Sequence, residues 1–381
     1  MMKYAIRNGM TAAMLAAAAG TAMANPTVDG VLNSGEGYTL VAVQTNGTQF
    51  GDSNLAQQFG ANGSEIGATY AVISGGRLYL MFTGNLESNY NKLEVFFDCT
   101  SGGQNTLRGD NVDLDYNGLN RMGDDGSSGG NGLKFDSPFE ADYWLGVTIG
   151  GGGGPSGYDV YTNAAFLRTG GWNHDANYNS LDYGAYDGSD AATVVTFDGP
   201  QLDAYNPNGQ GLYLFAQYGP RTTTANPSSP VSGLIEATVN NSNSGGVTSS
   251  DASAALGVTT GVEVSIDLNE LGYDGASVIK VCAFINGGGH DYVSNQFAAP
   301  LPSGYGNMAD PRYVNLAAAP GRQWFPVTGC PSDWNGDGSV DDFDFFDFLN
   351  DFSAGTADFN LDQSTDDFDF FDFLNAFNVN C

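Results

Sequence analysis

The sequence predicts a mainly β protein, in which a large, jelly-roll-like antiparallel β-sandwich is followed by a small helical domain of two loop-helix repeats. Two observations support this. From position 25 to about 326, short apolar runs alternate with clusters of Gly, Asn, Asp and Ser, without a long helical pattern. From position 333 to 377, one pattern of Asp and Asn residues occurs twice, 25 residues apart, and each copy ends in apolar residues at helical spacing.

We divide the chain into residues 1–24, a sandwich domain at 25–326 and a helical domain at 327–381. In the first part, Lys3 and Arg7 precede an Ala-rich run, which ends in the small-residue site Ala22-Met23-Ala24. This order is typical of a secretory signal peptide. We therefore expect a protein that is secreted, extracellular or held at the cell surface. No later run is apolar for long enough to span a bilayer, so we expect no transmembrane segment.

The charge of the chain limits its partners. Twelve Lys and Arg against 43 Asp and Glu give a formal net charge of -31. Binding to a phosphate backbone requires a basic face, and here the basic residues are scattered singly. We expect no nucleic-acid partner.

The sandwich prediction depends on eleven apolar runs that are bounded by turn-forming residues. The runs are 38–43, 66–73, 78–83, 93–97, 143–149, 158–164, 193–197, 212–217, 234–239, 262–266 and 278–285. Because helical patterns do not separate them, they favour two packed antiparallel sheets over βαβ units. One short helical turn is expected at 267–272.

The C-terminal repeat carries the strongest chemical pattern. Its Asp and Asn residues fall at positions 1, 3, 5, 9 and 12 of each copy, which is the spacing of a calcium-binding loop. The expected ligands of two calcium ions are Asp333, Asn335, Asp337, Ser339, Asp341 and Asp344, and Asp358, Asn360, Asp362, Ser364, Asp366 and Asp369. The alternative is an acidic segment that is only solvated or disordered. Five ligand positions in register and many Phe residues argue against it.

Each loop continues into an apolar segment with helical spacing, at 343–352 and 368–377. The loops and these segments resemble a dockerin, the paired calcium-loop module, in the variant that ends secreted proteins of planctomycete-like bacteria. The resemblance covers about the last fifty residues and is most specific from Asp333 to Asp341. It implies a docking partner, either a cohesin-like protein or an envelope scaffold.

The sequence departs from dockerins at two kinds of position. In the second copy, Gln363 occupies the glycine position and Thr365 the valine position. After position 9, where dockerins carry small hydroxyl residues that contact a cohesin, this chain has Asp342, Phe343, Asp367 and Phe368.

Four cysteines allow three pairings. Cys330 and Cys381 lie just outside the two repeats, and a two-fold arrangement of repeats brings its own ends together, so we expect them to form a disulfide. Cys99 and Cys282 remain, either as partners of each other or as free buried thiols.

Short pieces of the sandwich domain resemble family 9-like carbohydrate-binding modules. These pieces are residues 28–32, 78–80, 94–98 and 261–272. The resemblance implies carbohydrate binding, which commonly uses exposed aromatic faces; the candidates are Trp144, Trp172, Tyr178 and Tyr183. For Trp144 the alternative is a strand residue that packs in the core.

A third Asp-rich turn offers another candidate metal site, with Asp113, Asp115, Asn117 and Asp124 at positions 1, 3, 5 and 12. Arg121 at position 9 is an unfavourable neighbour for calcium. The alternative is a turn in which the Asp and Asn side chains bond only to their own backbone.

We identify no catalytic residues. His174 and His290 are the only histidines, and neither has a zinc-type spacing or a nucleophile motif around it. Glu94 and Glu140 could be paired as glycosidase carboxylates, but strand alternation predicts that Glu94 faces solvent. We therefore expect a secreted protein whose sandwich is a binding or structural module carried by a docking domain. The alternative is a polysaccharide-degrading glycoside hydrolase or lyase that is assembled through the same docking domain.

Overall fold

The structure is a computed structural model. It describes residues 25–50, 63–109, 111, 118–124, 131–150, 159–167, 180–184, 195–196, 235–242, 255–269, 271–273, 278–328, 332, 334, 340–355, 357, 359 and 365–379.

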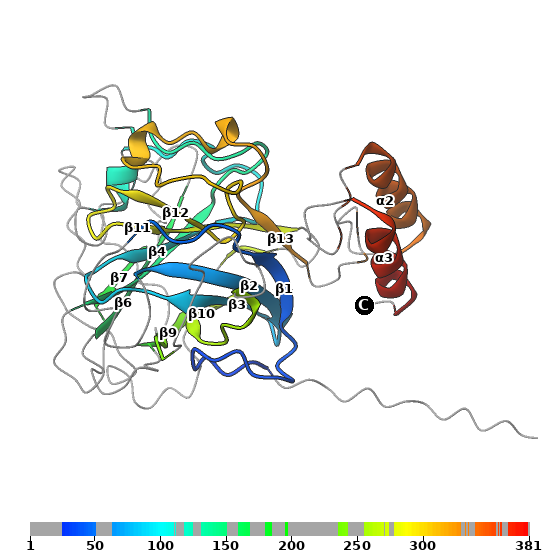
Figure 1. Ribbon diagram of the computed structural model, residues 1–381, viewed down its shortest axis with the longest axis horizontal. Coiled ribbons are helices and arrows are strands. Elements are labelled where there is room, and N and C mark those ends of the chain that lie inside the picture. Colours follow the sequence, from blue (N-terminus) through cyan, green and yellow to red (C-terminus); the bar gives the residue numbers. More distant parts are fainter. Residues whose placement is uncertain are drawn as a thin grey trace, which may run out of the picture.

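The strands of the described chain form two antiparallel sheets (Figure 1). One sheet has the order β1 (Thr39–Val43), β2 (Glu65–Ser74), β3 (Arg77–Asn85), β10 (Gly261–Asp267), β9 (Ile235–Val239) and β8 (Val195–Thr196). The other has the order β12 (Val293–Phe297), β11 (Ile279–Asn286), β4 (Lys92–Asp98), β5 (Tyr143–Gly150), β6 (Asp159–Phe166) and β7 (Ser180–Gly184), with β13 (Phe325–Val327) also paired to β11. The predicted mainly β architecture with two antiparallel sheets is confirmed.

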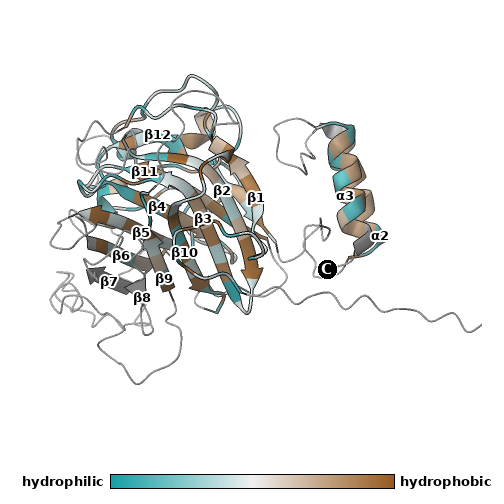
Figure 2. Cartoon of the chain, turned by 60° about the horizontal axis from the view of Figure 1, so that its bottom comes forward, coloured by the Kyte–Doolittle hydropathy of each residue, from teal (hydrophilic) through white to brown (hydrophobic). Residues whose placement is uncertain are grey.

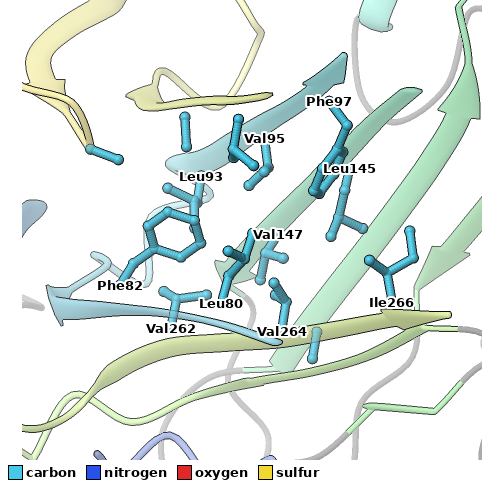
Figure 3. Packing of buried hydrophobic residues seen from close by; sticks show 14 of the residues in the cluster. Leu80, Phe82, Leu93, Val95, Phe97, Leu145, Val147, Val262, Val264 and Ile266 are labelled. Carbon is cyan, nitrogen blue, oxygen red and sulfur yellow. The ribbon is translucent and has the colours of Figure 1, made fainter. Parts of the chain in front are cut away.

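The main core lies between the two sheets. Leu80 and Phe82 of β3 point toward Leu93 and Val95 of β4, and Val147 of β5 lies beside them (Figure 3). These side chains recur at every second position, so one face of each strand supplies the core. Figure 2 shows the resulting alternation of hydrophobic and hydrophilic residues along the strands.

The outer face of the seven-stranded sheet is buried as well. Its cover comes from the chain between β4 and β5, which includes η2 (Leu119–Met122), and from the chain after β12, which includes η5 (Pro311–Tyr313) and η6 (Leu316–Ala318). The second core beneath this cover contains Phe96, Leu107, Phe135, Phe139, Trp144, Phe284, Phe297 and Trp324. As a result, every residue of β4 is buried, on both faces of the strand.

Ten of the eleven predicted runs coincide with strands, and the run at 212–217 lies outside the described residues. The strands β7, β12 and β13 were not predicted. At 267–272 the described residues form a turn in which the amide of Leu271 donates to the carbonyl of Asp267.

Two helices follow the sandwich in the chain: α2 (Asp342–Ala354) and α3 (Asp367–Val379). They cover the two segments for which helices were predicted. Helix α2 ends at Gly355, whose φ of 74° is a left-handed conformation that glycine adopts without strain. No helix within the described residues is long and apolar enough to cross a membrane.

Candidate functional site

Both C-terminal helices begin with the same pair of aspartates. In α2, the Asp341 side chain accepts a hydrogen bond from the Phe343 amide at 2.8 Å, and the Asp344 carboxylate accepts one from the Asp341 amide at 2.9 Å. This reciprocal arrangement is a capping box. The second copy repeats both bonds through Asp366 and Asp369, each at 2.8 Å.

These four aspartates occupy positions 9 and 12 of the two predicted calcium loops. Asp344 and Asp369 at position 12 have no solvent exposure, whereas Asp341 and Asp366 at position 9 are exposed. Burying a carboxylate is costly unless a cation or hydrogen bonds compensate it. The segment 328–381 contains 13 Asp and no Lys, Arg or His, so it has no basic side chain of its own to do so.

The remaining predicted ligands lie outside the described residues, as do Cys330 and Cys381; they are Asp333, Asn335, Asp337, Ser339, Asp358, Asn360, Asp362 and Ser364. Within the described parts of the chain, no three His, Cys, Asp or Glu side chains gather as metal ligands. The full predicted set contains only oxygen donors, most of them carboxylates, and this suits the hard cation Ca²⁺. Asp341, Asp344, Asp366 and Asp369 are the described residues that could hold such an ion.

The aromatic core between α2 and α3 has two-fold symmetry. Corresponding residues of the two copies lie 25 positions apart in the sequence. The pair Phe345–Phe377, with ring centroids 6.0 Å apart, therefore corresponds to the pair Phe370–Phe352, whose centroids are 5.8 Å apart. Phe348 and Phe373 are exchanged with each other, and their rings stack at 3.9 Å. The repeat in the sequence is therefore also a repeat in the packing.

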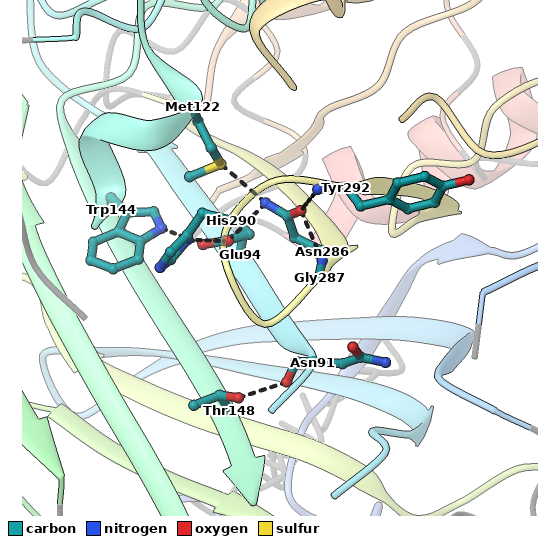
Figure 4. Close-up of polar contacts among 9 residues, drawn as sticks. All are labelled: Asn91, Glu94, Met122, Trp144, Thr148, Asn286, Gly287, His290 and Tyr292. Carbon is teal, nitrogen blue, oxygen red and sulfur yellow. Dashed lines mark hydrogen bonds and ion pairs between the residues drawn. The ribbon is translucent and has the colours of Figure 1, made fainter. Parts of the chain in front are cut away.

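A second polar cluster lies in the sandwich, around Glu94 of β4 (Figure 4). One carboxylate oxygen, Oε2, accepts from Nε1 of Trp144 at 2.8 Å. The other, Oε1, lies 2.7 Å from Nδ1 of His290 and accepts from Nδ2 of Asn286 at 3.1 Å. Glu94, Trp144, Asn286 and His290 are all fully buried.

The local sequence explains how these groups meet. Gly146 of β5 lies directly opposite Glu94, and a Cβ atom there would come within 2.6 Å of the Trp144 ring. The missing side chain leaves the space through which the indole reaches the carboxylate. On β11, Oδ1 of Asn286 accepts from the amides of Gly287 and Tyr292, at 2.8 and 3.0 Å, and so closes the loop that carries His290.

The expectation that Glu94 faces solvent is wrong. Strand alternation places Glu94 on the outer face correctly, but the second core covers that face. Glu140, the other candidate carboxylate, is exposed. With both oxygens engaged by three buried side chains, Glu94 is arranged to fix the loop at His290 over the sheet, rather than to meet a sugar from solvent.

The other candidate residues are placed as follows. Trp144 is fully buried in β5, so its ring is not an exposed face for sugar binding. Tyr183 lies in β7, with its backbone paired to Thr162. Asp124 is exposed, and its backbone forms an isolated parallel β-bridge with that of Arg108. Trp172 and Tyr178, together with Asp113, Asp115 and Asn117, lie outside the described residues.

Cys99 and Cys282 are both buried and free. Cys99 belongs to the core between the sheets and Cys282 to the core on the outer face, so the sheet separates them. Burial raises the pKa of both thiols. Such thiols are poor nucleophiles and behave as small apolar side chains.

Two buried carboxyl groups on the six-stranded sheet have different surroundings. Glu263 accepts from the hydroxyl of Tyr38 at 2.6 Å and from the amides of Asp29 and Gly30 at 2.8 and 2.7 Å. No described donor reaches either oxygen of Glu65. Burial raises the pKa of both carboxyl groups to about 7.

Neither the family models, nor the curated proteins, nor the solved structures that were compared with this chain give a match.

Proposed function

We propose that this chain is an exported modular protein, in which a calcium-loaded, dockerin-like C-terminal module docks a β-sandwich to a cell-surface or scaffold partner. The sandwich is then a binding module, with carbohydrate as its ligand class, or a structural module. The observation that carries the proposal is the duplicated cap. In each copy the aspartates at positions 9 and 12 form the same bonds, and the one at position 12 is buried in a segment without basic residues.

Calcium fits this arrangement for an electrostatic reason. Like charges on neighbouring carboxylates raise the energy of the folded module, and a divalent cation offsets that repulsion. When bound, Ca²⁺ supplies the positive charge that holds a loop against the start of its helix. Asp344 and Asp369 contribute by keeping one oxygen on the N-cap amide, which fixes the carboxylate at the first turn.

The test is a calorimetric calcium titration of the full chain. We expect two bound ions, and we expect Asp344→Asn and Asp369→Asn each to weaken one site by tenfold or more. Asparagine keeps an oxygen that can accept the N-cap hydrogen bond, but it loses the charge. Asp347→Asn and Asp372→Asn are matched controls, because these aspartates are exposed on the same helices and occupy no ligand position. Unchanged binding in the first two variants would reject the calcium assignment.

Docking and ligand binding need separate assays. The full chain, immobilised in calcium and in EGTA, should retain an envelope component only in calcium. A glycan array then tests the sandwich, and any glycan that binds is incubated with the protein to look for released products. Product release would favour the alternative of a polysaccharide-degrading enzyme over a binding module.

A further inference from the structure

The two C-terminal helices expose the same pair of phenylalanines. Residues 341–350 and 366–375 are identical over ten positions. In α2, Phe343 is 68% exposed and Phe346 is 58% exposed; in α3, Phe368 is 69% exposed and Phe371 is 58% exposed. The members of each pair are three residues apart, so they are neighbours on one face of their helix.

These four side chains do not belong to the core between the helices. That core is formed by the other phenylalanines of the repeat, which pack across the two-fold axis. Single exposed apolar residues are common on protein surfaces. Two adjacent, half-exposed phenylalanines that are repeated on both helices form a larger apolar surface, of a kind that marks an interaction site.

The charged side chains beside each pair on its own helix are all negative. Asp342 and Asp347 are exposed beside the first pair, and Asp367 and Asp372 beside the second. The segment contains no basic residue. A second copy of this surface or an anionic lipid membrane would therefore be repelled, whereas lysine or arginine would be attracted.

We propose that the Phe343–Phe346 pair and the Phe368–Phe371 pair are two equivalent docking surfaces for a protein partner, whose matching surface is an apolar patch bordered by Lys or Arg. The inference rests on the proposed docking function and names the chemistry of its partner. The phenylalanines supply the buried contact, and the surrounding aspartates select a basic rim. This partner differs from one that recognises small hydroxyl residues.

The probe for the test is a synthetic amphipathic helical peptide with a leucine stripe bordered by lysines. A neutral peptide, in which glutamine replaces each lysine, keeps the stripe and removes the rim. We expect the full chain in calcium to bind two lysine peptides, more weakly at high salt, and to bind the glutamine peptide at least tenfold more weakly. Binding is followed by calorimetry.

Matched variants separate the phenylalanines from the charges. Phe343→Ser with Phe346→Ser should leave one peptide site, and adding Phe368→Ser with Phe371→Ser should remove both. A loss of about tenfold for each phenylalanine is the size expected for a contact residue. Asp342→Asn with Asp347→Asn should reduce the preference for the lysine peptide without removing binding of the glutamine peptide.

Several outcomes would overturn the inference: equal binding by the fourfold serine variant, no preference for the lysine peptide, self-association of the chain through these helices in sedimentation, or binding to anionic vesicles that depends on the four phenylalanines. Calcium binding and helicity are measured in the same samples. If calcium binds and the peptide does not, this inference fails while the calcium assignment stands. If calcium does not bind, the proposed function itself fails.

Discussion

Phe348 and Phe373 stack face to face across the C-terminal helix pair, with their ring centroids 3.9 Å apart and their planes inclined by 1°. They occupy the same position in the two copies of the repeat. Trp334 and Phe359 also occupy the same position in the two copies, and their rings pack in an edge-to-face arrangement against this pair. The ring centroids of Trp334 and Phe348 are 5.1 Å apart, and those of Phe359 and Phe373 are 5.6 Å apart. The contact is therefore the centre of a symmetric core.

This symmetry predicts that Phe348→Ala and Phe373→Ala are equally harmful. Each removes a fully buried ring, which typically costs about 3–5 kcal/mol. Thermal unfolding of the two helices, followed by circular dichroism at fixed calcium, would measure both effects. Phe346→Ala is the control and should change stability by less than about 0.5 kcal/mol, because that ring is exposed. Unequal losses for the two buried rings would show that the symmetry of the packing is not a symmetry of its energy.

The Glu94 cluster predicts a large loss of stability in the sandwich. Glu94→Leu removes the carboxylate to which Trp144, Asn286 and His290 bond. The nitrogen atoms of these three side chains would lose that partner inside a buried site. Leaving a buried donor without its acceptor typically costs about 1–3 kcal/mol for each group. Urea unfolding is the measurement, and Glu140→Leu, at an exposed position, is the control.

Gly146→Ala tests the same cluster from the opposite strand. The added methyl group would lie 2.6 Å from the Trp144 ring and would displace the indole from Glu94. We expect a loss of about 1–3 kcal/mol, as for overpacking in a core. If Gly146→Ala costs as much with Glu94→Leu as without it, the two residues do not act on a common contact.

Glu65 and Glu263 predict a dependence of stability on pH. Burial raises the pKa of each carboxyl group from about 4.5 to about 7. Between these values the folded chain holds more protons than the unfolded chain, so stability falls as the pH rises through this window. Over the whole window, each group lowers the free energy of unfolding by roughly 3 kcal/mol. Urea unfolding from pH 4.5 to pH 8, at fixed calcium, would measure the slope.

Replacing the two glutamates should have opposite effects. Glu65→Gln removes an ionisable group that no described donor reaches. It also places an amide donor opposite Asn85, whose Oδ1 has no described donor either. We expect it to stabilise the protein at pH 8 by about 1–3 kcal/mol and to flatten the pH slope. Glu263→Gln should destabilise the protein at pH 8, where the ionised carboxylate accepts from Tyr38 and from the two amides, since a single amide oxygen cannot accept from all three. The same response from both variants would contradict this account.

Two of the strands that were not predicted, β12 and β13, lack the sequence pattern of a strand for physical reasons. β12 contains Ser294, Asn295 and Gln296 in succession, and these buried polar side chains have no apolar alternation. Asn295 and Gln296 are held by hydrogen bonds to distant backbone, from Asn295 to the carbonyl of Gly47 and from Gln296 to the carbonyl of Asn46. β13 has only three residues, with a proline at its centre. Pairing with β11, and not local propensity, makes it a strand.

The position of Glu94 could not be predicted from alternation alone, because alternation fixes the face and not what covers it. One local signal was present. Phe96 and Phe97 are adjacent in β4, so large apolar side chains point to both faces of that strand. The C-terminal helices were predictable because the repeat sets their caps and their aromatic core within about fifty residues, without long-range pairing.

The last prediction concerns the two calcium loops. Their caps and aromatic contacts match in the structure, so a difference in affinity has to come from loop residues that differ in the sequence. At position 6 the first loop has Gly338 and the second has Gln363. In calcium-binding loops of this spacing, position 6 makes a sharp turn that favours positive φ, which costs a residue with a Cβ about 1 kcal/mol more than glycine.

The second loop also has Thr365 where the first has Val340, so its position 8 is less apolar. With matching ligands in both copies, we expect the second site to bind calcium about five- to tenfold more weakly, if about 1 kcal/mol is the whole difference. Gln363→Gly should tighten the weaker site, and Gly338→Gln should weaken the stronger one. Calorimetry on the full chain should resolve two steps that approach each other in Gln363→Gly. A single step that Gln363→Gly leaves unchanged would mean that the turn at position 6 is not strained, and the two sites would then have to be ranked as equal.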